Sequence, residues 1–284
     1  MEQRIDSRIR LPFGYREVTL EQFQDYYGKY NEILNVEEQS KKSIKDLEIE
    51  MEHAKVDFGV IHAEYEFGEN AQLLNEKVAE VVLASKGKFK GFGTINLERL
   101  QPMDMIETVH QIRELGLAGI NLQPPFFNVN PLDRRLYPIY ATAHSLGLIV
   151  SFHTGIHYSL TNTLEHSNPI YLDTIAVDFP GLKMIACHSG WPWIPEILAI
   201  TRRHANIFLD FGGISPKYIQ QEHSGWEEIF HTMNNLLKRQ ILFATDWPVI
   251  PMEQSVRMWE ESSLKEDTLQ HLFYENANNL FKFV

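Results

Sequence analysis

The sequence predicts a (β/α)8 TIM barrel, and three observations support this fold class. Eight short apolar runs alternate with helical patterns along the 284 residues, as they do in parallel α/β proteins. The runs recur at intervals of roughly 30 residues, the length of a strand–helix–strand unit. No glycine-rich phosphate loop follows the first run, although a doubly wound open sheet usually has one there. We therefore expect eight buried parallel strands closed into a barrel.

The apolar runs are expected to form the strands. In the first, "RIDSRIR", isoleucine and serine alternate with Asp6, Arg8 and Arg10, and this period of two residues indicates a strand. The others are mostly β-branched or aliphatic, which is typical of strands buried on both faces. The expected strands are residues 4–9, 57–62, 89–95, 118–122, 147–152, 182–187, 206–210 and 240–245.

Helical patterns fill the intervals between the strands. Pro102 and Pro169 suit the first turn of a helix, and Asn168 suits the cap before one. Gly147 and Gly181 stand where helices end and strands begin. The expected helices are residues 43–54, 75–85, 102–115, 137–146, 169–179, 193–204, 226–238 and 267–281.

The interval between the first two strands is longer than the others. Residues 11–40 account for the excess, and they are polar and aromatic. We interpret them as a helical segment inserted after strand 1 that caps the barrel mouth, within a single domain of residues 1–284. A homodimer contact is the alternative role for the aromatic side chains, which are Phe13, Tyr15, Phe23, Tyr26, Tyr27 and Tyr30.

Composition limits the partners of the protein. The net charge of −12 and the isoelectric point of about 5.5 argue against nucleic acid or an anionic membrane as a partner. The first residues lack the apolar core of a signal peptide, and no apolar run reaches the roughly 18 residues of a membrane span. The chain has one cysteine, Cys187, which excludes an internal disulfide. We expect a cytoplasmic protein that acts on a small molecule.

Polar residues stand at the ends of the expected strands, where barrel enzymes carry their chemistry. His153, His188 and Asp246 follow the fifth, sixth and eighth strands. Two histidines and an aspartate suit the activation of water, with or without a metal. His62 and Gln123 end the second and fourth strands and are expected to line the pocket. The alternatives are buried histidines bonded to neighbours and an aspartate that caps the next helix.

Two other kinds of nucleophilic site find no support. A Ser-His-Asp triad lacks its G-x-S-x-G elbow. Cys187 alternates with His188, so we expect its thiol to point away from the cavity.

The motifs "GINLQPPFF", "VSFHTG", "ACHSGWPW", "NIFLDFGG" and "ILFATDWPVIP", in this order and spacing, resemble the amidohydrolase-related family. That resemblance covers nearly the whole chain and implies a (β/α)8 barrel. It also implies hydrolysis or non-oxidative decarboxylation of small carboxylated compounds, usually with one divalent metal, often zinc.

The resemblance assigns roles to individual positions. His153 falls on a metal-binding histidine, His188 on the histidine that activates water or polarises substrate, and Asp246 on a metal ligand and proton shuttle. The family's first strand typically reads Ile-Asp-x-His-x-His and supplies two further ligands. In this sequence Arg8 and Arg10 stand at both of those histidine positions.

Arginine has no lone pair to donate to a metal, so Arg8 and Arg10 cannot be ligands. We expect tight metal binding to be lost. The alternative is a single weakly held divalent metal, with zinc as the expected ion, bound by His153, His188 and Asp246.

The sequence therefore leaves three functions open. The leading hypothesis is hydrolysis of a lactone or similar carbonyl in a small carboxylated substrate. In it Asp246 activates water, His188 polarises the carbonyl, and Arg8 and Arg10 bind the carboxylate. The second is metal-dependent decarboxylation of a small aromatic or muconate-like acid, and the third is a non-catalytic barrel that binds anions.

Overall fold

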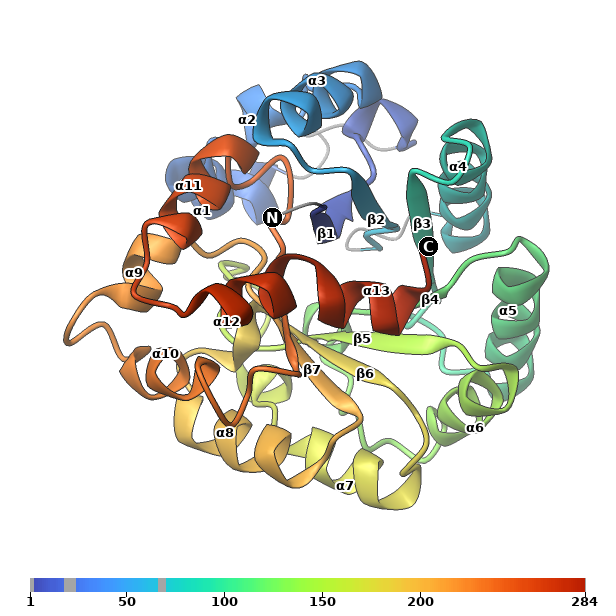
Figure 1. Cartoon of the computed structure of the whole chain (residues 1–284). Helices are drawn as coiled ribbons and strands as arrows, with labels where there is room; N and C mark the ends of the chain where they lie inside the picture. The colour runs from blue at the N-terminus through green and yellow to red at the C-terminus, as the bar shows by residue number, and fades with distance from the viewer. Residues whose placement is uncertain (1–2, 18–23, 66–69, 284) are drawn as a thin grey trace.

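The computed structural model of the protein describes residues 3–17, 24–65 and 70–283. Eight parallel strands follow one another in chain order around a barrel with helices outside it (Figure 1). The predicted fold class is confirmed. The strands are β1 Ile5–Arg10, β2 Phe58–His62, β3 Phe89–Thr94, β4 Gly119–Leu122, β5 Ile149–His153, β6 Met184–Cys187, β7 Ile207–Asp210 and β8 Ile241–Leu242.

The barrel closes between β1 and the segment that follows β8. The backbone N–H of Ser7 donates to the carbonyl oxygen of Phe243 at 2.9 Å, and that of Asp246 donates to Arg8 at 2.9 Å. The N–H of Arg10 donates to the carbonyl of Trp247, also at 2.9 Å. This closure places Asp246 beside the two arginines of β1.

Helices cover the outside of the barrel at the predicted places, but the short helix Pro216–Gln220 was not predicted and the helix expected at 226–238 ends at Met233. Three further differences have a visible basis. The helix after β2 begins four residues earlier than residue 75, because the side chain of Asn70 caps it by accepting the N–H of Leu73 at 3.2 Å. The predicted helix 267–281 is divided by a π-helical turn, His271–Glu275. An amphipathic helix, Met252–Glu260, was not predicted; it buries Met252, Val256 and Trp259.

The helices are α1 Gln24–Leu34, α2 Val36–Gln39, α3 Ile44–Ala54, α4 Ala71–Ala84, α5 Pro102–Glu114, α6 Tyr137–Leu146, α7 Tyr171–Asp178, α8 Ile194–Arg203, α9 Pro216–Gln220, α10 Glu227–Met233, α11 Met252–Glu260, α12 Glu266–Gln270 and α13 Asn276–Phe281. Short 3-10 turns lie at Phe13–Tyr15, Pro124–Phe127, Glu165–Ser167 and His188–Gly190.

The predicted cap, residues 11–40, contains α1 and α2. Residues 18–23, including Phe23, lie outside the described residues, as do the side chains of Tyr26 and Tyr27. That this segment is an insertion, and that residues 1–284 form one domain, stay predictions.

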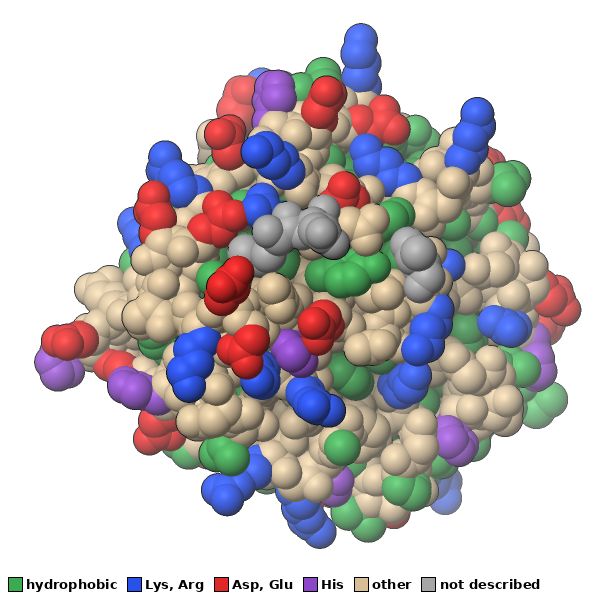
Figure 2. All heavy atoms as spheres, in the orientation of Figure 1, with side chains coloured by type: hydrophobic (Ala, Val, Ile, Leu, Met, Phe, Trp, Pro, Cys, Tyr) green, Lys and Arg blue, Asp and Glu red, His purple; other side chains and the backbone are tan. Residues whose placement is uncertain are grey.

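Apolar side chains fill the amino end of the barrel. Ile5, Val60, Ile185 and Leu242 belong to one buried cluster that Phe281 of the last helix completes. Figure 1 shows α13 lying across this end of the barrel. On the same face, acidic and basic side chains are interspersed (Figure 2). No helix of the described residues is long and apolar enough to cross a membrane.

Candidate active site

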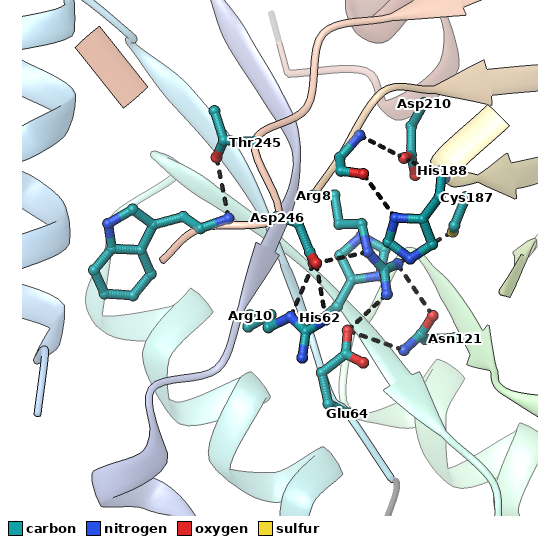
Figure 3. Close-up of polar contacts among 12 residues, drawn as sticks. Arg8, Arg10, His62, Glu64, Asn121, Cys187, His188, Asp210, Thr245 and Asp246 are labelled. Carbon is teal, nitrogen blue, oxygen red and sulfur yellow. Dashed lines mark hydrogen bonds and ion pairs between the residues drawn. The ribbon is translucent and has the colours of Figure 1, made fainter. Parts of the chain in front are cut away.

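Arg8 lies inside the barrel, at the level where the strands end (Figure 3), with 0% of its side chain exposed. Its Nε donates to Oδ1 of Asp246 at 3.0 Å, and its Nη2 donates to Oε1 of Glu64 at 2.8 Å. Its Nη1 donates to Sγ of Cys187 at 3.1 Å. Because arginine stays protonated at any working pH, this is a permanent buried charge, and two carboxylates balance it.

Arg8 therefore does not line the cavity, contrary to the expectation that it binds a substrate carboxylate. Every contact of its guanidinium described above is with another buried side chain. A substrate carboxylate would have to displace Glu64 or Asp246 from Arg8, which would break a buried ion pair.

Cys187 also differs from the prediction, because its thiol faces the barrel interior and contacts Arg8. The alternation of side chains along β6 ends with Cys187, since His188 lies beyond the strand with a positive φ of 61°. Burial raises the pKa of the Cys187 thiol well above its usual value, so the sulfur remains a neutral acceptor. Cysteine nucleophile chemistry has no support here.

His62 and Gln123 are buried and do not line the cavity, contrary to the expectation. Nε2 of His62 lies 3.1 Å from the carbonyl oxygen of Ser7, and Nδ1 lies 3.4 Å from Nη1 of Arg8. Burial, with the nearby Arg8 charge, lowers the pKa of His62 to about 3. The neutral ring therefore donates to Ser7 and turns its lone pair toward Arg8. Gln123 is buried and donates through Nε2 to Glu64, so both residues support the Arg8 cluster.

Two members of this cluster, Glu64 and Asn121, were not assigned a role from the sequence. Oδ1 of Asn121 accepts from Nη1 of Arg8 at 3.4 Å, and its Nδ2 donates to the carbonyl of Ala63 at 2.9 Å. Glu64 stands two residues after His62, so a period of two residues places both on one side of the strand. That spacing was the available signal for Glu64.

Arg10 makes a bidentate pair with Asp246 and lines the cavity. Its Nε donates to Oδ1 at 3.0 Å and its Nη2 donates to Oδ2 at 2.8 Å. The side chain of Arg10 is 21% exposed, whereas that of Asp246 is 2% exposed. Arg10 is therefore the arginine of β1 that a bound molecule can reach.

Asp246 is poorly suited to the predicted role of general base. Burial alone would raise the pKa of its carboxyl, but the charges of Arg10 and Arg8 outweigh burial and hold that pKa well below its usual range. Its two oxygens already accept from three arginine nitrogens, so taking a proton from water would mean giving up one of these bonds. Asp246 is instead an anion fixed between two guanidiniums.

His153 ends β5 and lines the cavity, and only 6% of the residue is exposed. Its Nε2 has no hydrogen-bond partner among the described residues. Burial, followed by the proximity of His188 and His157, lowers the pKa of His153 well below its usual value. The ring is neutral, and its ring centroid lies 4.7 Å from that of His188.

His188 is held by the turn that follows β7. Its Nδ1 lies 2.7 Å from the carbonyl oxygen of Gly212, so Nδ1 donates to that oxygen. Oδ1 of Asp210 accepts the backbone N–H groups of both His188, at 3.1 Å, and Gly212, at 3.0 Å. Asp210 thus fixes the position of the imidazole through two backbone segments.

The cavity above these side chains has a volume of about 750 Å³. Trp191 and Trp226 lie in its wall with nearly parallel rings, 6.4 Å between centroids. His157 also lines it, and burial lowers the pKa of this histidine. Tyr30 and Ile33 of α1 reach the same cavity. The lining combines aromatic surface with a few polar groups, as small-molecule sites do.

Comparison with known proteins identifies the family. A model of the amidohydrolase family matches residues 37–283. The chain belongs to the amidohydrolase family.

Similar proteins include one relative in sequence and two solved structures. Protein fluG of Emericella nidulans is 23% identical over 131 residues, which are 46% of this chain but 14% of that protein. An uncharacterized TIM-barrel protein from Bordetella bronchiseptica superposes with a TM-score of 0.82 and 24% identity over 99% of both chains. A dihydroxybenzoic acid decarboxylase from Polaromonas sp. JS666, with bound manganese and the inhibitor 2-nitroresorcinol, gives a TM-score of 0.72 and 15% identity over 99% and 97%. The two structural similarities show the fold of this amidohydrolase.

The side chains present do not fit a divalent metal at this place. No group of three or more His, Cys, Asp or Glu side chains able to hold one occurs among residues 3–17, 24–65 and 70–283. Three arginine nitrogens already donate to the oxygens of Asp246. Unit charges 4 Å apart interact by about 4 kcal/mol at an effective dielectric constant of 20, and a dication would be repelled by each guanidinium about twice as strongly.

Proposed function

We propose that this amidohydrolase hydrolyses a lactone or similar carbonyl in a small carboxylated substrate. The observation that carries the proposal is the juxtaposition, in one aromatic cavity, of Arg10 and the neutral His153, whose Nε2 has no partner among the described residues. Arg10 is the cation that a carboxylate meets on entering, and guanidinium recognises carboxylate well. His153 offers a lone pair for the proton of a water molecule.

The reaction would use His153 in place of Asp246 as the base. As the water oxygen bonds to the carbonyl carbon, Nε2 of His153 takes a water proton and the carbonyl π electrons move to the oxygen. The positive charge of Arg10 stabilises that oxyanion or the substrate carboxylate. The intermediate then collapses, the bond to the ring oxygen breaks, and His153 returns the proton to that oxygen. One lactone and one water give one hydroxy acid.

Decarboxylation is the second candidate, and the structural similarity to a dihydroxybenzoic acid decarboxylase favours it. Loss of carbon dioxide leaves a carbanion that an acid must protonate. Burial holds the pKa of His153 low, so the resting ring carries no extra proton for that carbanion, whereas in hydrolysis His153 receives its proton from the attacking water. That difference is why we place hydrolysis first.

The test is a screen of lactones, esters and aromatic acids that carry a carboxylate, with purified protein. Hydrolysis is expected to release acid in a pH-stat and to incorporate oxygen from labelled water into the product. His153→Gln should reduce kcat by about 10²- to 10⁴-fold, the range for loss of a general base. His110→Gln on the exposed surface of α5 is the matched control.

Other outcomes of the screen would replace the proposal. Release of carbon dioxide without hydrolysis would establish the decarboxylase. Binding of carboxylates without any turnover would establish the anion-binding barrel.

A further inference from the structure

Four charged side chains alternate in sign through the carboxyl end of the barrel, in the order Glu64, Arg8, Asp246, Arg10. The successive contacts are 2.8 Å from Glu64 to Arg8, 3.0 Å from Arg8 to Asp246, and 2.8 Å from Asp246 to Arg10. They come from the segment after β2, from β1 and from the segment after β8. The exposed fraction of the side chain is 0% for Arg8 and 2% for both carboxylates.

We propose that Arg8 is a fixed internal cation that organises this site and takes the position a divalent ion would need beside Asp246. In this role Arg8 does not touch substrate. It is a positioning residue. It keeps Asp246 ionised and oriented toward Arg10, and Asp246 in turn holds Arg10 at the cavity wall. Glu64 is its permanent counter-ion.

The surroundings of Arg8 match a guanidinium rather than a metal or a lysine. Acceptor atoms from separate parts of the barrel surround its planar group, so that Nε and Nη2 each face a carboxylate and Nη1 faces three further side chains (Figure 3). Arginine presents five N–H donors in fixed directions, whereas lysine offers three on one atom. The acceptors are Oδ1 of Asp246, Oε1 of Glu64, Oδ1 of Asn121, Sγ of Cys187 and Nδ1 of His62.

Gly212 leaves room for the aliphatic part of the Arg8 side chain. A Cβ atom at Gly212 would lie 3.0 Å from Cδ of Arg8 and 3.2 Å from Cβ of Asp246. Gly212 also supplies the carbonyl that fixes the His188 imidazole. The turn that positions His188 thus packs directly on the arginine, and both depend on the same glycine.

The first test is the metal content of the wild-type protein. After incubation with excess zinc or manganese and desalting, elemental analysis should find metal far below a stoichiometric amount, and neither ion should raise the melting temperature. A stoichiometric ion retained by the wild type would overturn the inference.

The second test measures whether Glu64 and Arg8 act as a pair, through melting temperatures of Arg8→Met, Glu64→Gln and the double variant. Arg8→Met removes the cation of the buried Glu64 and leaves the buried Asp246 with Arg10 alone, so it should lower the melting temperature most. Adding Glu64→Gln should recover part of that loss, because one of those carboxylates becomes neutral. Strictly additive effects would contradict the pairing.

Glu64→Gln keeps the shape of the side chain, so it tests the inference even if Arg8→Met does not fold. It should lower the melting temperature, and an unchanged value would count against the role of Glu64. Exposed Glu107→Gln on α5 is the control for loss of one carboxylate. None of these measurements uses a substrate, so this inference and the proposed reaction can fail separately.

Discussion

The two ends of the barrel are filled in opposite ways. At the amino end, aliphatic side chains such as Ile5 and Leu242 pack under α13. At the carboxyl end, Arg8 and Asp246 form a buried network of charges. Apolar packing has no direction and tolerates exchange of similar volumes, whereas a buried charge requires its particular partner. The same strand, β1, contributes to both ends, and this contrast predicts different responses to mutation.

The largest expected effect is that of Arg8→Met on stability. Removing one partner of a buried ion pair typically costs about 3–5 kcal/mol; Glu64 would lose its cation, and Asp246 would keep only the partly exposed Arg10. Chemical unfolding measures the loss, with surface Arg113→Met on α5 as the control. A loss no greater than that of the control would show that the buried charges do not stabilise the carboxyl end.

Leu242→Ala should destabilise the amino end by a similar or slightly smaller amount, about 2–5 kcal/mol, through the cavity it creates. Leu242 is fully buried, whereas Leu83, the control site for the same substitution, is 83% exposed. Unlike Arg8→Met, this variant should leave the affinity for carboxylates unchanged when titrated by calorimetry. A parallel loss of affinity would mean that the apolar end also shapes the site.

The dependence of stability on pH should distinguish two aspartates of the charged end. Burial raises the pKa of Asp6 to about 7, above the value of about 3.9 in an unfolded chain. The folded state therefore holds an extra proton between these values, and stability should fall as pH rises from about 4 to 7. Asp246 acts in the opposite sense: its pKa is held low, so its contribution is present above about pH 4 and is lost at lower pH.

Unfolding in denaturant at several pH values measures both slopes. Asp6→Asn should remove the decline between about pH 4 and 7. Glu107→Gln should keep the decline, because Glu107 is exposed. A decline of unchanged size in Asp6→Asn would assign it to another group.

Arg10→Gln should have the smallest effect on stability, about 1 kcal/mol or less. Arg10 is partly exposed, and Asp246 still forms its ion pair with Arg8 in this variant. Its effect should fall on binding instead. KM for a carboxylated substrate should rise by about tenfold or more, the value of a charge-assisted hydrogen bond. Steady-state kinetics measures this, with the exposed Arg113→Gln variant as the control. An unchanged KM would show that Arg10 does not bind the substrate.

Much of the fold could be predicted from the sequence, because the local spacing of apolar residues indicates where strands and helices lie. The apolar runs gave all eight strands in their order. Most helix boundaries were near those of the structure, but Asn70 extends one helix, another ends at Met233 rather than residue 238, and Pro216–Gln220 was not predicted. Periodicity reports which residues are buried, and in a barrel this is sufficient to order the strands. The helix Met252–Glu260 was missed although its pattern is amphipathic.

The sequence by itself determined which residues gather at the carboxyl ends of the strands, since parallel strands in a barrel all end on one side. Only the tertiary structure decided what they do there. Arg8 and Arg10 are two residues apart on one strand, yet one is enclosed and the other lines the cavity. Glu64 and Asp246 cause that difference, because they approach from distant parts of the chain and balance the inner charge. A pattern along one strand contains no information about the side chains that meet it across the barrel.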